Sequence, residues 1–231
     1  KITGRPNLGS CQREYIVMQQ VLLSNLLSIL KQGEVDFDDR FQLEFNPSFL
    51  DSKGQAWLHE IYEDLGGKGK HPLLEKANFD IKINRVLFLF DSPIHFNRYR
   101  LISLRSDFYI EMSFPFSEAY KRLCRTYEKE CQKAGLQERI WNGPPVAGTW
   151  FGQASEPGDY SGVGASGWKL TAFNDAQIDL QSRIHGYKLI RIAPYETIMT
   201  GGSLKRLDQM LVNPNEDQRK VICNWFLRKL E

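Results

Sequence analysis

The sequence predicts one α/β (or α+β) domain in which helices flank a central mixed β-sheet. Residues 79–83, FDIKI, alternate apolar and polar side chains, as a half-buried strand does. Residues 86–90, VLFLF, are continuously apolar, which is typical of a strand covered on both faces. Residues 186–194, GYKLIRIAP, predict a further buried strand, which follows a helix expected at about 168–184.

The size and charge of the chain restrict its architecture and its partners. A length of 231 residues suits a single domain covering 1–231. With 42% hydrophobic and 25% charged residues, the composition is that of a soluble globular protein. The formal net charge of +2 gives no general attraction to nucleic acid or to a membrane, so a site for a polyanion would have to be a local patch.

The apolar stretches and the cysteines predict a cytoplasmic protein with no membrane partner. No stretch approaches the ~20 apolar residues that a bilayer-spanning helix needs, and no signal peptide is recognisable. The four cysteines, at positions 11, 124, 131 and 223, include no C-x-x-C pair. Reduced, apolar cysteines are therefore expected in preference to disulfides.

Helical periodicity recurs along the rest of the chain. We expect an N-terminal helix at 14–30, a second at 53–65, and a third with a basic side at 116–134. Two C-terminal helices are expected at about 203–230. The acidic and aromatic stretch 36–44 fits either a loop or a short strand.

Residues 142–167 are rich in glycine, proline and serine. This composition predicts a long inserted loop with one short strand around Thr149 to Phe151. Loops of this length inside a domain are usually functional or mobile. The aromatic residues Trp150, Phe151 and Trp168 near its ends could stack on nucleic-acid bases or fill the core, and the core is the commoner role.

Two aspartates mark the ends of the predicted hairpin. A two-residue turn at Asn84-Arg85 pairs position 80 with about position 89, which makes Asp80 and Asp91 spatial neighbours. Carboxylates on adjacent strand ends can bind Mg²⁺ for phosphodiester hydrolysis. Alternatively, Asp80 caps a turn and Asp91 caps a helix that starts near Pro93.

The surrounding residues resemble a nuclease family. The string LFDSPIH at 89–95 resembles the E-x-D-G-x-x-H motif of very-short-patch repair endonucleases in the PD-(D/E)XK superfamily. HGYKLIRIAPYE at 185–196 is similar to that family's later strand. HFNRYR at 95–100, with LHEIYEDLGG and WKLTAFND, resembles a group of uncharacterised bacterial proteins of the same superfamily. The resemblance covers a core at about 53–196.

The resemblance implies a restriction-endonuclease-like fold and a DNA-cutting activity in restriction or phage defence. Asp80 and Asp91 would bind Mg²⁺ or Mn²⁺, and His95 would position a water or a phosphate. His95 could instead pack beside Phe96. Asn97, Arg98 and Arg100 lie within about one helical turn of His95, and their donors could contact a nucleic-acid phosphate. Lys169 lies on the helix that in this superfamily can supply a polar residue to the site, so the resemblance implies a role for it too. For Arg98 and Arg100 a solvated helix face is the alternative.

Three positions depart from the family pattern. The metal-binding glutamate falls at Leu89, the glycine at Ser92 and the lysine at Pro93. One interpretation is a rebuilt site in which Glu14, or an acid from 36–44, supplies the missing ligand. The other is a catalytically inactive nuclease-like subunit that binds nucleic acid or a protein partner.

Overall fold

The fold was analysed in a computed structural model of the chain. The structure describes residues 10–138, 143–153, 159–161 and 165–230, and side chains are described from residue 18 onward, except those of 136–138.

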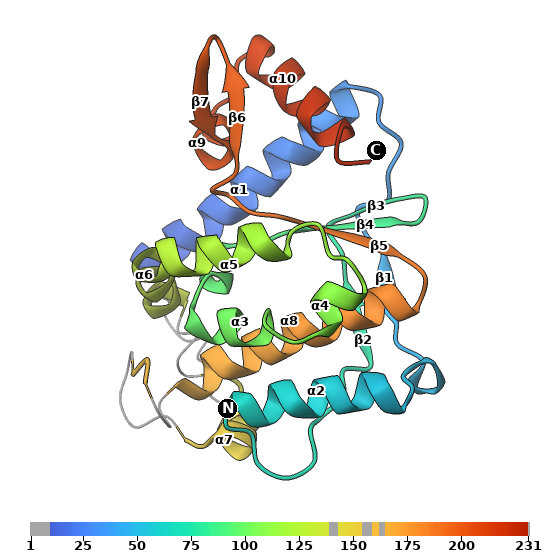
Figure 1. The fold of residues 1–231 in the computed structure, drawn as a ribbon. Coiled ribbons are helices and arrows are strands. Elements are labelled where there is room, and N and C mark those ends of the chain that lie inside the picture. The colour runs from blue at the N-terminus through green and yellow to red at the C-terminus, as the bar shows by residue number, and fades with distance from the viewer. Residues whose placement is uncertain (1–9, 139–142, 154–158, 162–164, 231) are drawn as a thin grey trace, which may run out of the picture.

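A three-stranded sheet lies at the centre of the molecule (Figure 1). Its strands are β3 (Ile81–Ile83), β4 (Val86–Phe90) and β5 (Lys188–Ile192), in the order β3-β4-β5. β3 and β4 form the predicted antiparallel hairpin, with Ile83 opposite Val86 and Asn84 in the left-handed region at φ 53°. β5 runs parallel to β4. The prediction of a mixed sheet flanked by helices in an α/β fold is confirmed.

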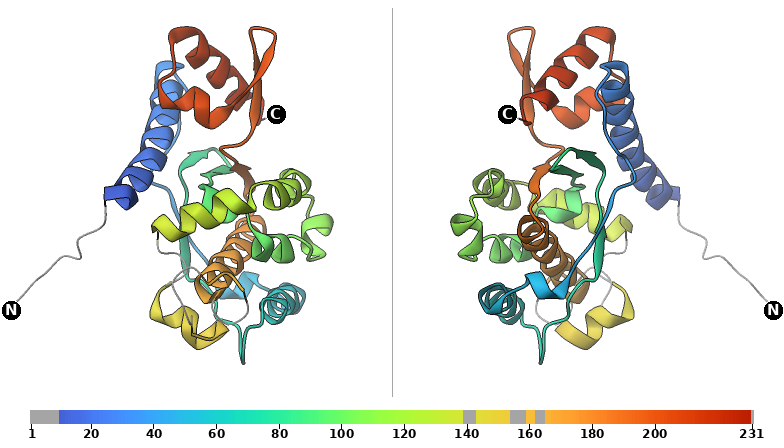
Figure 2. Two further views of the ribbon diagram at one scale, coloured as in Figure 1. Left: turned by 90° about the vertical axis from the view of Figure 1, so that its left-hand side faces the viewer. Right: turned by 90° about the vertical axis from the view of Figure 1, so that its right-hand side faces the viewer.

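Helices cover both faces of this sheet. The two side views in Figure 2 place α1 and α10 at one end of the molecule and α2, α7 and α8 at the other. The helices are α1 (Ser10–Gln32), α2 (Ser52–Asp64), α3 (Arg98–Ser103), α4 (Phe108–Glu111), α5 (Ser117–Thr126), α6 (Glu128–Glu138), α7 (Pro145–Phe151), α8 (Ser166–Ile184), α9 (Leu207–Val212) and α10 (Glu216–Leu227). Short 3₁₀ turns occupy Pro47–Phe49 and Pro93–His95.

The sheet separates two hydrophobic cores. Leu87 and Leu189 belong to the larger core, together with buried side chains of α2, α5 and α8. Phe88 and Ile190, their neighbours along the two strands, belong to the second core, with buried side chains of α1, α9 and α10. Because successive strand residues point to opposite faces, Arg191 shares the face of Leu189 and points toward α8.

Local sequence signals fix several helix starts. The side chain of Asp51 accepts a hydrogen bond from the backbone N–H of Gly54 and caps α2. Asn97 caps α3 by accepting from the N–H groups of Tyr99 and Arg100. A reciprocal capping box between Asn215 and Gln218 starts α10.

Two small sheets lie outside the central one. β1 (Gln42–Glu44) pairs with β2 (Lys76–Asn78), so the undecided stretch 36–44 ends in a short strand. β6 (Thr197–Thr200) and β7 (Ser203–Arg206) form a hairpin directly after β5. The expectation that 203–230 is wholly helical is therefore wrong at its start.

Two further predictions need correction. The strand expected around Thr149 to Phe151 is instead the end of helix α7. The single helix expected at 116–134 is divided into α5 and α6 at Tyr127, whose ring stacks on Tyr195 at 3.7 Å between centroids. Within the described residues, no helix combines the length and apolar character needed to cross a membrane. Cys124, Cys131 and Cys223 are buried and free.

Candidate functional site

Charged side chains from three elements meet on the α8 face of the sheet. Asp91 follows the last residue of β4, and Arg191 lies on β5 beside Leu89. Asp175 and Asp179 lie four residues apart on α8, a spacing that puts both carboxylates on the same helix face. The side chains of Asp91, Arg191, Asp175 and Asp179 are all buried. Together with Arg100 on α3 they form what we term the arginine–aspartate network.

Arg191 is the centre of this network. Its Nη1 donates to both carboxylate oxygens of Asp91, at 2.8 and 2.9 Å. Its Nε donates to Oδ1 of Asp179 at 2.7 Å, and its Nη2 reaches Oδ1 of Asp175 at 3.2 Å. The hydroxyl of Tyr120 donates to Oδ2 of Asp91 at 3.0 Å. One guanidinium thus binds three carboxylates, as its planar set of donors allows.

Arg100 closes the other side of the network. It is fully buried, and its Nη2 donates to Oδ2 of Asp179 at 2.5 Å. Its Nη1 donates to the hydroxyl of Tyr109 at 2.8 Å, and that hydroxyl donates to the same Asp179 oxygen at 2.6 Å. The Asp179 carboxylate therefore accepts from both arginines and from a tyrosine, so removing it would leave several buried donors unpaired.

His95 supplies the remaining positive charge. Its Nδ1 lies 2.7 Å from Oδ2 of Asp175. Burial opposes the charged imidazole, but the carboxylates of Asp175 and Asp91 outweigh it, so the pKa of His95 is raised. Burial opposes ionisation of Asp175 as well, yet His95 and Arg191 hold its pKa well below the usual range. With His95 protonated, three carboxylates face three cations and the buried charges balance.

Asp80 stands beside the network but is not part of it. Its Oδ2 accepts a hydrogen bond from the backbone N–H of Phe90 at 2.7 Å. Burial, with the nearby Asp91 adding to it and the Phe90 hydrogen bond opposing it, raises the pKa of Asp80 to about 6. Asp80 also lines a cavity of about 310 Å³ next to α1, which Asp39 shares. Asp39 itself forms an ion pair with Lys31 at 3.2 Å.

The residues present do not fit a two-aspartate metal site in this arrangement. Both oxygens of Asp91 are bound by a guanidinium, and Leu89, opposite Arg191 in the register, has no ligand atom to offer. Among the residues that the structure describes, no group of three or more His, Cys, Asp or Glu side chains is arranged to hold a metal ion. The helix-cap alternative for Asp91 is also wrong, because Ser92 precedes the 3₁₀ turn and Asp91 binds Arg191.

The residues expected to contact nucleic acid are scattered between surface and interior. Arg98 is exposed and pairs with Glu128, with its Nε 2.9 Å from Oε1. Asn97 is buried as the cap of α3, and Arg100 is buried in the network, so neither the phosphate role nor the solvated-face alternative describes Arg100. Lys169 is half-buried, with its ammonium 5.8 Å from the ring centroid of Tyr99.

The other proposed ligands stay apart from the network. Glu14 lies in α1, and its side chain is outside the described part of the chain. Among the acids of 36–44, Asp38 accepts from the backbone N–H of Arg40 and Glu44 is exposed on β1. The ring of His95 pairs with Asp175, so packing beside Phe96 does not describe its principal contact.

Sequence reasoning missed most of the network. Asp179, Tyr109 and Tyr120 were not expected at the site, and Arg191 was noted only as part of a motif. One signal was present: Asp175 and Asp179 are spaced i, i+4 on a helix that leads into a strand carrying an otherwise anomalous buried arginine.

Comparison with known proteins places the chain in a family. No curated protein and no solved structure gives a significant match. A family model described as a family of unknown function, DUF7255, matches residues 60–213, which is more than half of the chain. The matched region contains Asp80, His95 and every member of the arginine–aspartate network. The chain therefore belongs to this family of unknown function, DUF7255.

Proposed function

We propose that this chain is a non-catalytic module with a nuclease-like core that works by binding a protein partner. One observation carries the proposal: Arg191 Nη1 holds both oxygens of Asp91, at 2.8 and 2.9 Å. A carboxylate held in this way inside the protein has its negative charge balanced and its acceptor sites filled.

The guanidinium of Arg191 supplies the positive charge that a divalent cation would bring to such a cluster of acids. It lies opposite Leu89, the position at which the nuclease resemblance would require a glutamate. A permanent guanidinium neutralises the aspartates without exchange with solvent, because arginine stays protonated in proteins. The polar cluster then stabilises the fold and leaves no open coordination position for a reacting phosphate.

The surface favours a protein partner over a nucleic acid. Arg98 is already paired with Glu128, and Arg100 is inaccessible. Large apolar side chains are exposed instead: Ile110 is 70% exposed, and Met199 and Leu204, which face each other across the β6–β7 hairpin, are 61% and 63% exposed. The exposed apolar pair Met199 and Leu204 supports a protein-binding surface at the β6–β7 hairpin.

A metal-dependent nuclease is the second candidate, and one observation favours it. Asp80, with its pKa raised to about 6, and Asp39 both line the cavity of about 310 Å³ beside α1. An acid from the stretch 36–44 is one of the residues that could complete a rebuilt site. Raised carboxyl pKa values in a cavity also occur at active sites.

A cleavage assay separates the two candidates. Plasmid, single-stranded DNA and RNA are incubated with the full chain and Mg²⁺ or Mn²⁺, and no cleavage above the buffer control is expected. Metal-dependent cleavage that Asp80→Ala abolishes, while the exposed-acid control Asp64→Ala retains it, would establish the nuclease and contradict the proposal. Tight, salt-sensitive binding of nucleic acid without cleavage would contradict the choice of a protein partner.

A further inference from the structure

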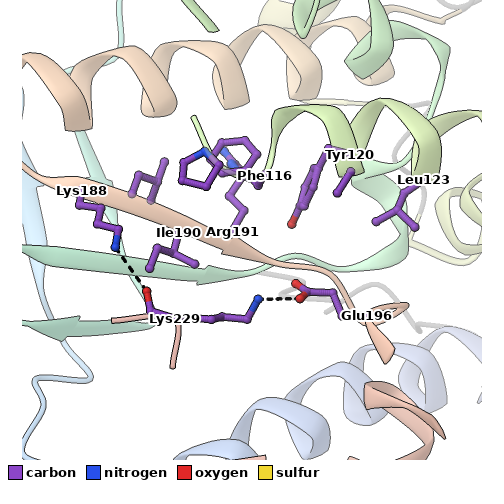
Figure 3. Close-up of a pocket in the computed structure, with 11 residues that line it drawn as sticks. Phe116, Tyr120, Leu123, Lys188, Ile190, Arg191, Glu196 and Lys229 are labelled. Carbon is purple, nitrogen blue, oxygen red and sulfur yellow. Dashed lines mark hydrogen bonds and ion pairs between the residues drawn. The ribbon is translucent and has the colours of Figure 1, made fainter. Parts of the chain in front are cut away.

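A cavity of about 280 Å³ lies between α5 and β5 (Figure 3). Its α5 wall carries the apolar side chains of Phe116, Ala119 and Leu123, and Leu189 and Ile190 of β5 also line it. An apolar cavity of ~150 Å³ can hold a molecule of benzene. The cavity beside β5 therefore has room for one aromatic ring with a short side chain, and its volume is close to the lower end of the ~300–1,000 Å³ range of small-molecule sites.

Most polar side chains around this cavity already have partners inside the protein. All three nitrogens of the Arg191 guanidinium donate to carboxylates of the arginine–aspartate network. The hydroxyl of Tyr120 donates to Asp91 at 3.0 Å. Lys229 forms an ion pair with Glu196 at 2.6 Å. The charges of these groups are thus balanced without a ligand.

Lys188 is the exception among the lining residues. In the part of the chain that the structure describes, its ammonium contacts the carbonyl oxygen of Lys229, at 3.5 Å, and has no carboxylate partner. The side chain is half-buried at the start of β5. A half-buried cation attracts an anion more strongly than an exposed cation does, because less water screens the pair. Lys188 therefore favours a negatively charged group at its end of the cavity.

The two ends of the cavity differ in charge. Lys188 is the first residue of β5, and Glu196 follows the last residue of that strand, Ile192, by four positions. At ~3.3 Å per residue, the strand alone separates Lys188 from Ile192 by about 13 Å. Figure 3 shows Lys188 and Glu196 at opposite ends of the lining residues, with Lys229 extended between them. A carboxylate bound beside Lys188 is therefore distant from the carboxylate of Glu196.

We propose that this cavity binds a small carboxylic acid that carries a single aromatic ring. The ring would lie against Phe116 and Ala119 on α5, and the carboxylate would pair with the ammonium of Lys188. The rings of Phe116 and Tyr120 already pack edge to face, with 5.2 Å between centroids. A further ring suits this wall better than an alkyl chain, because aromatic pairs attract each other beyond the area that they bury. The site does not depend on the proposed function.

The test titrates the ¹⁵N-labelled full chain with phenylpropionate and follows the amide chemical shifts. Phenylpropionamide has the same shape without the charge, and octanoate carries the carboxylate on an alkyl chain. We expect saturable shifts at Ala119, Leu189 and Ile190, with a Kd for phenylpropionate of about 1 mM or lower, given its size. Binding should be about fivefold weaker for the amide, which cannot form the ion pair, and about threefold weaker for octanoate.

Two variants locate the ligand. Lys188→Gln should weaken binding of phenylpropionate about fivefold and leave binding of the amide unchanged, whereas unfolding would weaken both. Ala119→Trp should fill the cavity and weaken every ligand at least about tenfold. Lys205→Gln removes the charge of an exposed lysine on β7, so it is the matched control and should change no affinity. Thermal melting verifies that each variant is folded.

Three results would overturn the inference. These are absence of saturable binding at millimolar phenylpropionate, equal affinity for the acid and its amide, and unchanged binding in Ala119→Trp. Tighter binding of octanoate than of phenylpropionate would overturn the assignment of an aromatic ligand. The cleavage assay tests the proposed function alone, so the two proposals can fail separately.

Discussion

The two faces of the central sheet are stabilised by different physics, although the same strands build both. On the α8 face, Arg191 binds buried carboxylates through directional, charge-assisted hydrogen bonds. On the other face its neighbours Ile190 and Ile192 pack against α1 and α10 with Phe88. The rings of Phe88 and Phe226 lie 4.5 Å apart there. A one-residue shift in register would exchange the two sets of side chains.

The difference shows which face gives the fold its structural specificity and which face gives it most of its stability. Apolar packing tolerates substitutions that keep the total side-chain volume, and it contains no titratable group. A buried ion network depends on every partner, because an unpaired buried charge costs far more than a complete network contributes. We therefore expect substitutions on the α8 face to cause large, pH-dependent losses in the free energy of unfolding. Substitutions on the α10 face should cause graded losses that do not depend on pH.

The largest effect is expected from Asp179→Ala. The change leaves Arg100, Arg191 and the Tyr109 hydroxyl without a shared acceptor inside the protein. We expect a loss of about 3–5 kcal/mol in the free energy of unfolding, measured by urea denaturation. Glu118→Ala removes an exposed ion pair with Lys121 and should leave the midpoint unchanged. A loss for Asp179→Ala as small as that of the control would show that the network is not coupled.

Ile192→Ala tests the apolar face. Ile192 is fully buried against α1 and α10 and has no polar partner. Truncation should cost about 2–4 kcal/mol from lost burial and the cavity left behind. Urea denaturation at several pH values between 5 and 8 should give the same loss throughout. A loss that varies with pH would mean that the two faces are not independent.

Asp80→Asn should change the pH dependence of stability. The folded pKa of Asp80 is raised to about 6, so its favourable contribution is complete below its unfolded pKa and is lost as pH rises through 6. Asparagine keeps an acceptor for the N–H of Phe90 and does not ionise. Relative to wild type, the variant should gain about 2–3 kcal/mol between pH 4 and pH 7.5. Parallel stability curves for the two proteins would contradict the raised pKa.

His95→Gln should give the smallest effect, and the contribution that it removes also declines as pH rises. Because the folded pKa of His95 is raised, its stabilisation is complete below its unfolded pKa and declines as pH rises through the folded value. At pH 6 the variant should lose about 1–2 kcal/mol, and less at higher pH. NMR titration of the imidazole provides the direct measurement, and a pKa below the usual value for histidine would contradict the balanced network.

Local patterns predicted the scaffold well. The alternation in 79–83, the apolar run in 86–90 and a two-residue turn were enough to place the β3–β4 hairpin and its register. The β6–β7 hairpin had a signal of its own in Gly201-Gly202, both at positive φ, between Met199 and Leu204. Each flanking strand is only four residues long, which is too short for its alternation to stand out from the helical pattern that follows.

The network could not be predicted from local patterns. Asp91 and Arg191 are 100 residues apart in sequence, and only the parallel pairing of β4 and β5 brings them together. The break between α5 and α6 at Tyr127 has the same origin, since its ring stacks on Tyr195 from a distant segment. Helical periodicity continues through that point, so tertiary contact overrides local preference.

The claim that Arg191 keeps metal ions from binding Asp91 is tested most directly with a paramagnetic ion. Mn²⁺ is added stepwise to the ¹⁵N-labelled chain, and line broadening is followed at the amides of Asp80 and Asp91. Because Arg191 binds both carboxylate oxygens of Asp91, we expect no selective broadening at these two residues near stoichiometric Mn²⁺. Saturable broadening at both, lost in Asp80→Asn, would show that a metal ion enters the cluster and would contradict a non-catalytic network.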